Sequence, residues 1–61
     1  MVMRRVTVKK IGAVLFQLEL LLEAQDMELA DRDILTEVEA HLRGMHDRIA
    51  AAEGLPRWRE S

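Results

Sequence analysis

The sequence predicts an all-α protein, an antiparallel two-helix hairpin that dimerises into a four-helix bundle. Nine of the twelve residues from Ile11 to Leu22 are apolar, which is more apolar surface than one partner helix covers. Neither Gly nor Pro interrupts residues 13–43, a stretch rich in good helix formers. Polar side chains break the apolar pattern around residues 30–33, which favours two helices over one.

The chain has 61 residues, enough for a single domain (1–61) and little more. A chain of this size buries only about 60% of its unfolded surface, so it usually needs a disulfide, a metal or association for firm stability. It contains no cysteine, which excludes disulfides and thiolate metal sites. Association is therefore the expected source of additional stability.

The first helix is expected over residues 9–28. Its apolar side chains follow the three- and four-residue steps of an amphipathic helix at Ile11, Val14, Leu18 and Leu21. A turn is expected at 29–31, with Asp31 or Asp33 as the N-cap of the next helix. One continuous helix is the alternative, because nothing in residues 25–33 strictly forbids helix.

The second helix is expected over residues 32–53. Its seam alternates three- and four-residue steps through Leu35, Val38, Leu42, Met45 and Ile49, as facing helices require. Gly54 and Pro56 mark its end, because Gly adopts the left-handed conformation after a helix and Pro cannot continue one. Residues 54–61 are expected to form an irregular tail. Two helices of nearly equal length with a short connection indicate an antiparallel hairpin.

Charge is sorted along this hairpin. Residues 1–10 carry a net charge of +4, whereas residues 19–39 carry −7. The hairpin therefore has a basic end, where the chain termini meet, and an acidic end at the turn. Two copies packed with opposite ends together place unlike charges side by side, which predicts an antiparallel dimer that weakens with added salt.

The predicted function is a small, non-catalytic protein–protein interaction module, such as a regulator, adaptor or accessory subunit, that self-associates through aliphatic helix faces. Either a second copy or a different protein would satisfy the apolar surface. Phe16 and Leu20 are left over from the hairpin seam and are expected to face the second chain. The complete predicted interface comprises Ile11, Val14, Leu15, Phe16, Leu18, Leu20, Leu22, Leu35, Val38, Leu42, Met45 and Ile49.

The alternative function is a small DNA- or RNA-binding regulator that uses the basic end. Its candidate contact residues are Arg4, Arg5, Thr7, Lys9, Lys10, Arg57, Trp58 and Arg59, with Trp58 as a stacking platform. Val6 and Val8 alternate with Arg5, Thr7 and Lys9, the pattern of a short strand at residues 3–9. A strand followed by two helices resembles the ribbon-helix-helix repressors, and that resemblance implies strands that enter the major groove.

In overall build the chain resembles the Rop family of plasmid copy-number regulators. The similarity lies in its length, its two matched helices and an acidic turn around Leu29, Ala30 and Asp31. The resemblance implies a helical hairpin that dimerises antiparallel into a four-helix bundle. It is a resemblance of architecture, so the RNA-binding function of that family is not carried over.

No enzyme chemistry is expected. Thr36 has no evident base partner, and there is no Gly-rich phosphate loop. His41 and His46 are five residues apart, about 140° around a helix, so they cannot face one metal. We therefore expect no cofactor and no metal site. We also expect no membrane span, because the apolar run contains Glu19 and is shorter than the roughly 20 residues that cross a bilayer, and hence a cytoplasmic location. A peripheral membrane peptide that inserts Phe16 and Trp58 is the third alternative.

Overall fold

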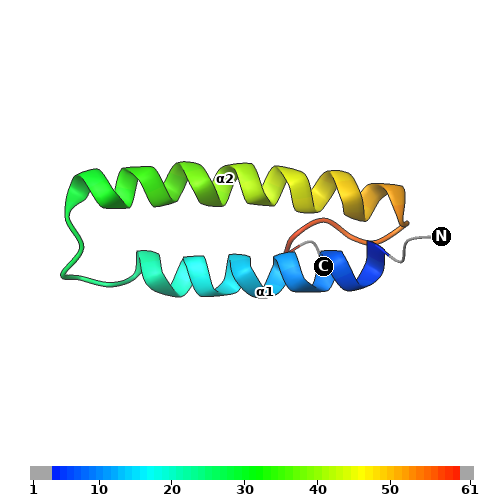
Figure 1. Cartoon of the computed structure of the whole chain (residues 1–61), viewed down its shortest axis with the longest axis horizontal. Coiled ribbons are helices and arrows are strands. Elements are labelled where there is room, and N and C mark those ends of the chain that lie inside the picture. The colour runs from blue at the N-terminus through cyan, green and yellow to red at the C-terminus, as the bar shows by residue number, and fades with distance from the viewer. Residues whose placement is uncertain (1–3, 60–61) are drawn as a thin grey trace.

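The computed structural model describes residues 4–59 and contains two α-helices. Helix α1 spans Arg4–Leu22 and helix α2 spans Leu29–Ala52. The helices lie side by side along the 42 Å axis of the molecule, joined at one end by residues 23–28 (Figure 1). This confirms the predicted all-α helical hairpin.

The predicted strand at residues 3–9 is wrong for the part of it that the structure describes. Residues 4–9 form the first turns of α1, and Met3 lies outside the described residues. Helix extends this far because helical spacing puts Val8 on the same side as Ile11 and Leu15, and all three are buried. A lone strand would have no neighbouring strand to satisfy its backbone hydrogen bonds.

The connection also lies earlier than expected. Helix α1 ends at Leu22 rather than near residue 28, and residues 29–31, the predicted turn, form the first turn of α2. The guanidinium group of Arg32 donates hydrogen bonds to the carbonyl oxygens of Leu22 and Ala24. These contacts satisfy backbone acceptors that the end of α1 leaves free. They place a cation at the negative end of its dipole.

The N-cap of α2 is Glu28, not Asp31 or Asp33. Glu28 has extended backbone angles (φ −69°, ψ 149°) and makes no capping hydrogen bond through its side chain. Asp31 instead lies within the first turn, where its carboxylate interacts favourably with the positive end of the helix dipole.

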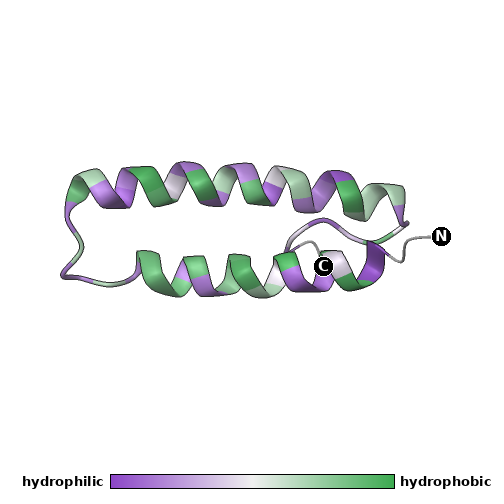
Figure 2. Cartoon of the chain, in the orientation of Figure 1, coloured by the Kyte–Doolittle hydropathy of each residue, from purple (hydrophilic) through white to green (hydrophobic). Residues whose placement is uncertain are grey.

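The core is small and lies nearer the open end of the hairpin than the turn. Its buried apolar side chains are Val8, Ile11, Leu15 and Ala50, and only Leu15 is large and fully buried among the described residues. Figure 2 shows hydrophobic residues along α1 from its middle to the turn, whereas hydrophilic residues are interspersed along α2. The apolar residues near the turn are therefore less buried than those of the core.

Helix α2 ends as the sequence predicts. Gly54 has a φ of +71°, in the left-handed region. The Gly54 amide donates to the Ala51 carbonyl oxygen at 3.2 Å and the Leu55 amide to the Ala50 carbonyl oxygen at 2.8 Å. This pair of bonds is the Schellman arrangement, which turns the chain back on itself. Residues 55–59 then run back along the hairpin toward α1 (Figure 1), where Trp58 lies against Gly12.

Within residues 4–59, neither helix combines the length and apolar character needed to cross a bilayer.

Candidate functional site

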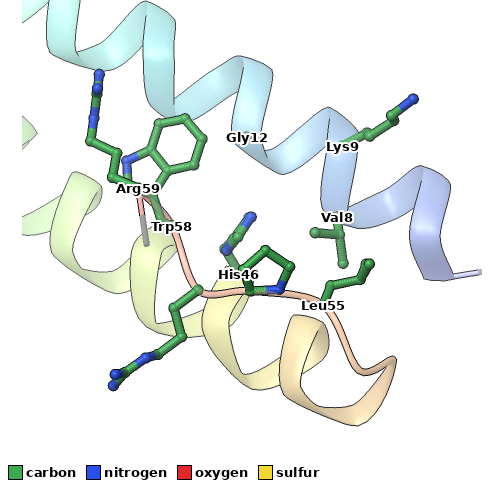
Figure 3. A pocket seen from close by; sticks show the side chains of 9 residues that line it. Val8, Lys9, Gly12, His46, Leu55, Trp58 and Arg59 are labelled. Atoms are coloured by element: carbon green, nitrogen blue, oxygen red, sulfur yellow. The ribbon is translucent and has the colours of Figure 1, made fainter. Parts of the chain in front are cut away.

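The returning segment, residues 54–59, is docked against both helices, and we call it the tail. Its anchor is Trp58, whose ring lies so close to Gly12 that a Cβ there would be 3.1 Å from the ring atom Cζ3. The ring meets that of His46 edge-on, with centroids 5.6 Å apart and planes at 71°. Figure 3 shows the tail crossing His46, with Leu55 beside Val8. Trp58 of the tail therefore contacts α1 through Gly12 and α2 through His46.

Carboxylates on the two helices hold the tail in place. Asp47 of α2 accepts a hydrogen bond from the Trp58 backbone amide at 2.7 Å. Glu19 of α1 accepts one from the indole N–H at 3.3 Å and forms an ion pair with Arg59. The Arg59 guanidinium also lies over the Trp58 ring, 5.3 Å from its centroid. Each helix therefore contributes one carboxylate to the docked tail.

These partners shift the ionisation of the carboxyls. Hydrogen bonding to the Arg59 guanidinium lowers the pKa of Glu19 below its ordinary value, and the same pairing raises the pKa of Arg59. The backbone amide of Trp58 is the main cause that lowers the pKa of Asp47. Both carboxyls are thus stabilised in the charged form while the tail is docked.

A shallow pocket of about 430 Å³ opens beside the tail. Its apolar lining comes from Val8, Leu55 and Trp58, and its cationic rim includes Lys9 and Arg59 (Figure 3). His46 contributes a ring, and its Nδ1 lies 3.1 Å from Asp47 Oδ1. The lining offers no hydroxyl or thiol that such a His–Asp pair could activate.

The structure divides the predicted nucleic-acid residues into two groups. Those in the first turns of α1 are exposed: Arg4, Arg5, Thr7, Lys9 and Lys10. Those in the tail are Arg57, Trp58 and Arg59, and the Trp58 ring contacts Gly12, His46 and Arg59. Arg57 and Arg59 share a pocket lining with Lys9, but Arg59 is paired with Glu19 in the turn half of α1, and the Trp58 ring packs against both helices.

The predicted interface residues fall into three classes of burial. Ile11 and Leu15 are buried within the hairpin. The half-buried members are Leu18, Leu22, Leu35, Leu42 and Ile49. The exposed members are Val14, Phe16, Leu20, Val38 and Met45.

Exposed side chains from both helices share the face opposite the tail. Helical residues two positions apart point about 160° away from each other. Val14 and Leu21 each lie two residues after a tail contact, Gly12 and Glu19 respectively, so they point away from the tail. On α2, Met45 lies two residues before the tail-binding Asp47, and Val38 lies two turns before Met45.

These four side chains remain 36–49% exposed. The half-buried Leu18 and Leu42 lie between them and the contact of the two helices. We call this set the aliphatic face, and it comprises Val14, Leu18, Leu21, Val38, Leu42 and Met45.

Phe16 and Leu20 are not part of the aliphatic face. Phe16 follows Gly12 by one helical turn and so lies toward the tail's side of α1. Leu20 follows by another turn, on the outer side of the helix. Leu21, which the predicted interface omits, joins the face instead. Its seven-residue spacing from Val14 is the sequence signal that identifies it.

Sequence reasoning also missed the docking site of the tail. His46 is buried and belongs to this site, whereas His41 is exposed. The available signal was Gly12, a small residue inside a strongly apolar helix, which leaves room for the single Trp of the chain. Across residues 4–59 no group of three or more His, Asp or Glu side chains is arranged to hold a metal ion.

No protein-family model matches this chain, and comparisons with curated proteins and with solved structures found no match either.

Proposed function

We propose that this chain is a non-catalytic protein–protein interaction module that self-associates, in the form of a four-helix-bundle dimer. The observation that carries the proposal is the aliphatic face, whose members Val14, Leu21 and Val38 are 49%, 46% and 40% exposed. Contiguous apolar patches to which two elements contribute are typical of interaction surfaces. Isolated exposed apolar side chains would not support the same conclusion.

The size of the core supports the same proposal. Among the described residues only Leu15 is both large and fully buried, and the buried face of α2 includes Glu39 and His46. The carboxylate of Glu39 is paired at 3.5 Å with Arg43, whose side chain is half-exposed, and an ion pair that reaches solvent adds little net stability. A second chain over the aliphatic face would supply the apolar burial that a single hairpin lacks.

Solution mass tests this proposal. Sedimentation equilibrium over a concentration series at low salt should give a mass of twice 7.0 kDa that falls toward 7.0 kDa on dilution. Thermal unfolding should occur at lower temperature in diluted samples, because dissociation accompanies unfolding. A compact monomer that keeps the same unfolding temperature at every concentration would contradict the proposal.

A nucleic-acid-binding regulator is the competing proposal, and it rests on the exposed cations at the start of α1. Fluorescence anisotropy with short labelled DNA and RNA duplexes and single strands tests it. Binding that weakens steeply with salt and is lost in an Arg4→Ala, Arg5→Ala double variant would support this function. Arg43→Ala is the matched control, because it removes an exposed cation from the middle of α2, away from the basic end.

A further inference from the structure

We propose that the aliphatic face binds the aliphatic face of a second copy in antiparallel orientation, about a two-fold axis perpendicular to the helices. This inference rests on the proposed self-association and adds the surface, the orientation and the pairs of residues that meet. The tail, anchored by Trp58, occupies the opposite face of the hairpin. A second copy on that opposite face would have to displace Trp58.

The spacing of the aliphatic face is self-complementary. Val14 and Leu21 are seven residues apart, and so are Val38 and Met45. In an antiparallel pair of α1 helices, Val14 of one copy can lie against Leu21 of the other, and the converse contact follows by symmetry. The same holds for Val38 and Met45 in an antiparallel pair of α2 helices. A two-fold interface requires this reciprocity.

One axis serves both helix pairs at once. Gly12 lies beside His46, since a Cβ at residue 12 would be 4.0 Å from His46 Nε2. We count residues from that contact toward the turn, from Gly12 along α1 and from His46 along α2. The midpoint of residues 14 and 21 then lies one residue farther along than the midpoint of residues 38 and 45. That difference is a rise of about 1.5 Å, which side-chain packing absorbs. Both helix pairs can therefore be in register in one complex.

Charge selects the antiparallel orientation. The exposed cations Arg4, Arg5, Lys9 and Lys10 lie at the open end. The exposed acids at the turn end are Glu23, Asp26, Glu28, Asp31 and Asp33. Packing with the same ends together would gather the acids of both copies, whereas opposite ends place each acidic turn beside the partner's cations.

Matched charge substitutions test the face. Val38→Glu places a carboxylate on the aliphatic face, at a side chain that is 40% exposed. Leu20→Glu places one outside that face, at a side chain that is 48% exposed. The two-fold symmetry places the new carboxylate of each copy in the interface, so two charges are buried per dimer. We therefore expect Val38→Glu to raise the dissociation constant by about 100-fold or more. Leu20→Glu should leave it nearly unchanged. Far-UV circular dichroism and Trp58 fluorescence of each monomer verify that the hairpin and the docked tail persist.

The orientation has its own test. The chain contains no cysteine, so Gln25→Cys introduces a single spin-label site at the turn. The two-fold axis crosses α1 midway between residues 14 and 21, and residue 25 lies seven to eight residues beyond it toward the turn, so antiparallel packing separates the two labels by about 25–35 Å. Packing with the same ends together brings them within about 20 Å, or two helix spacings.

The outcomes separate this inference from the proposed function. A dimer that survives Val38→Glu but is disrupted by Leu20→Glu overturns the face and leaves self-association intact. A dimer with the short label distance overturns the orientation alone. A wild-type chain that stays monomeric overturns both. Loss of the dimer in Val38→Glu together with the long label distance supports the inference.

Discussion

The ring of Trp58 lies against the backbone of Gly12, at a distance that leaves little space for a side chain at residue 12. A Cβ there would be 3.1 Å from Cζ3 and 3.7 Å from Cε3 of the ring. A glycine inside a helix ordinarily costs about 1 kcal/mol relative to alanine. At residue 12 this cost is offset by the contact that joins the tail to α1.

We expect Gly12→Ala and Gly44→Ala to differ in their effect on stability. Gly44 lies inside α2, and a Cβ there would meet nothing within 4 Å. Gly44→Ala should therefore raise the free energy of unfolding by about 0.5–1 kcal/mol. Gly12→Ala gains the same helix propensity but crowds Trp58, so its net gain should be smaller or absent. Urea unfolding followed by circular dichroism measures both variants.

The larger substitution Gly12→Leu should displace Trp58 altogether. Because the chain has a single Trp, its emission should shift to the red as the ring becomes exposed. Equal stabilisation by the two alanine variants, with unchanged emission in Gly12→Leu, would show that the contact with Gly12 is unimportant.

Arg32 should stabilise the end of α1. Its guanidinium donates to the Leu22 and Ala24 carbonyl oxygens from a partly buried position. Arg32→Met keeps most of the aliphatic side chain but leaves those acceptors without the cation, which should cost about 1–2 kcal/mol of unfolding free energy. Arg48→Met is the control, because Arg48 is exposed on the same helix and lies far from the turn. If the two variants unfold at the same urea concentration, the proposed role of Arg32 fails.

Gly54 should be required for its backbone conformation alone. Its φ is +71° and a Cβ would meet nothing within 4 Å. Gly54→Ala should therefore lower the unfolding free energy by about 1–2 kcal/mol through backbone strain. Gly54→Asn should cost less, because Asn adopts the left-handed region more readily. Equilibrium unfolding in urea measures the series, and an alanine variant as stable as the wild type would be inconsistent with this account.

Acid should release the tail before it unfolds the helices. Docking lowers the pKa of Glu19, through Arg59, and of Asp47, through the Trp58 amide. A carboxyl whose pKa is lower in the folded state stabilises that state above its unfolded pKa. This contribution is lost as the pH falls through the lowered value. Trp58 emission should therefore shift at a pH below the ordinary 4.5 of a glutamate, while far-UV circular dichroism changes less.

The double variant Glu19→Gln, Asp47→Asn is the control for this titration. It should give a tail that is loosened already at neutral pH and an emission spectrum that no longer depends on acid. A wild-type transition centred above pH 4.5 would assign the change to other groups.

The antiparallel hairpin and the Gly54 stop were predictable from the sequence because they depend on local rules. Helical periodicity and left-handed glycine preference act over a few neighbouring residues. The start of α1 was not predictable in this way, because alternation of Val6 and Val8 suits a strand equally well. Burial of Val8 beside Ile11 and Leu15 decided for helix, and that burial needs α2 to be in place.

The sequence by itself determined that this chain forms two helices with more apolar surface than one hairpin hides, and with opposite charge at its two ends. Only the tertiary structure decided which apolar residues stay exposed. Trp58 docks through Gly12, Glu19 and Asp47, residues far apart in the chain, and so covers one face of the hairpin. This long-range contact decides which face of the hairpin remains open, and a local sequence pattern cannot predict it.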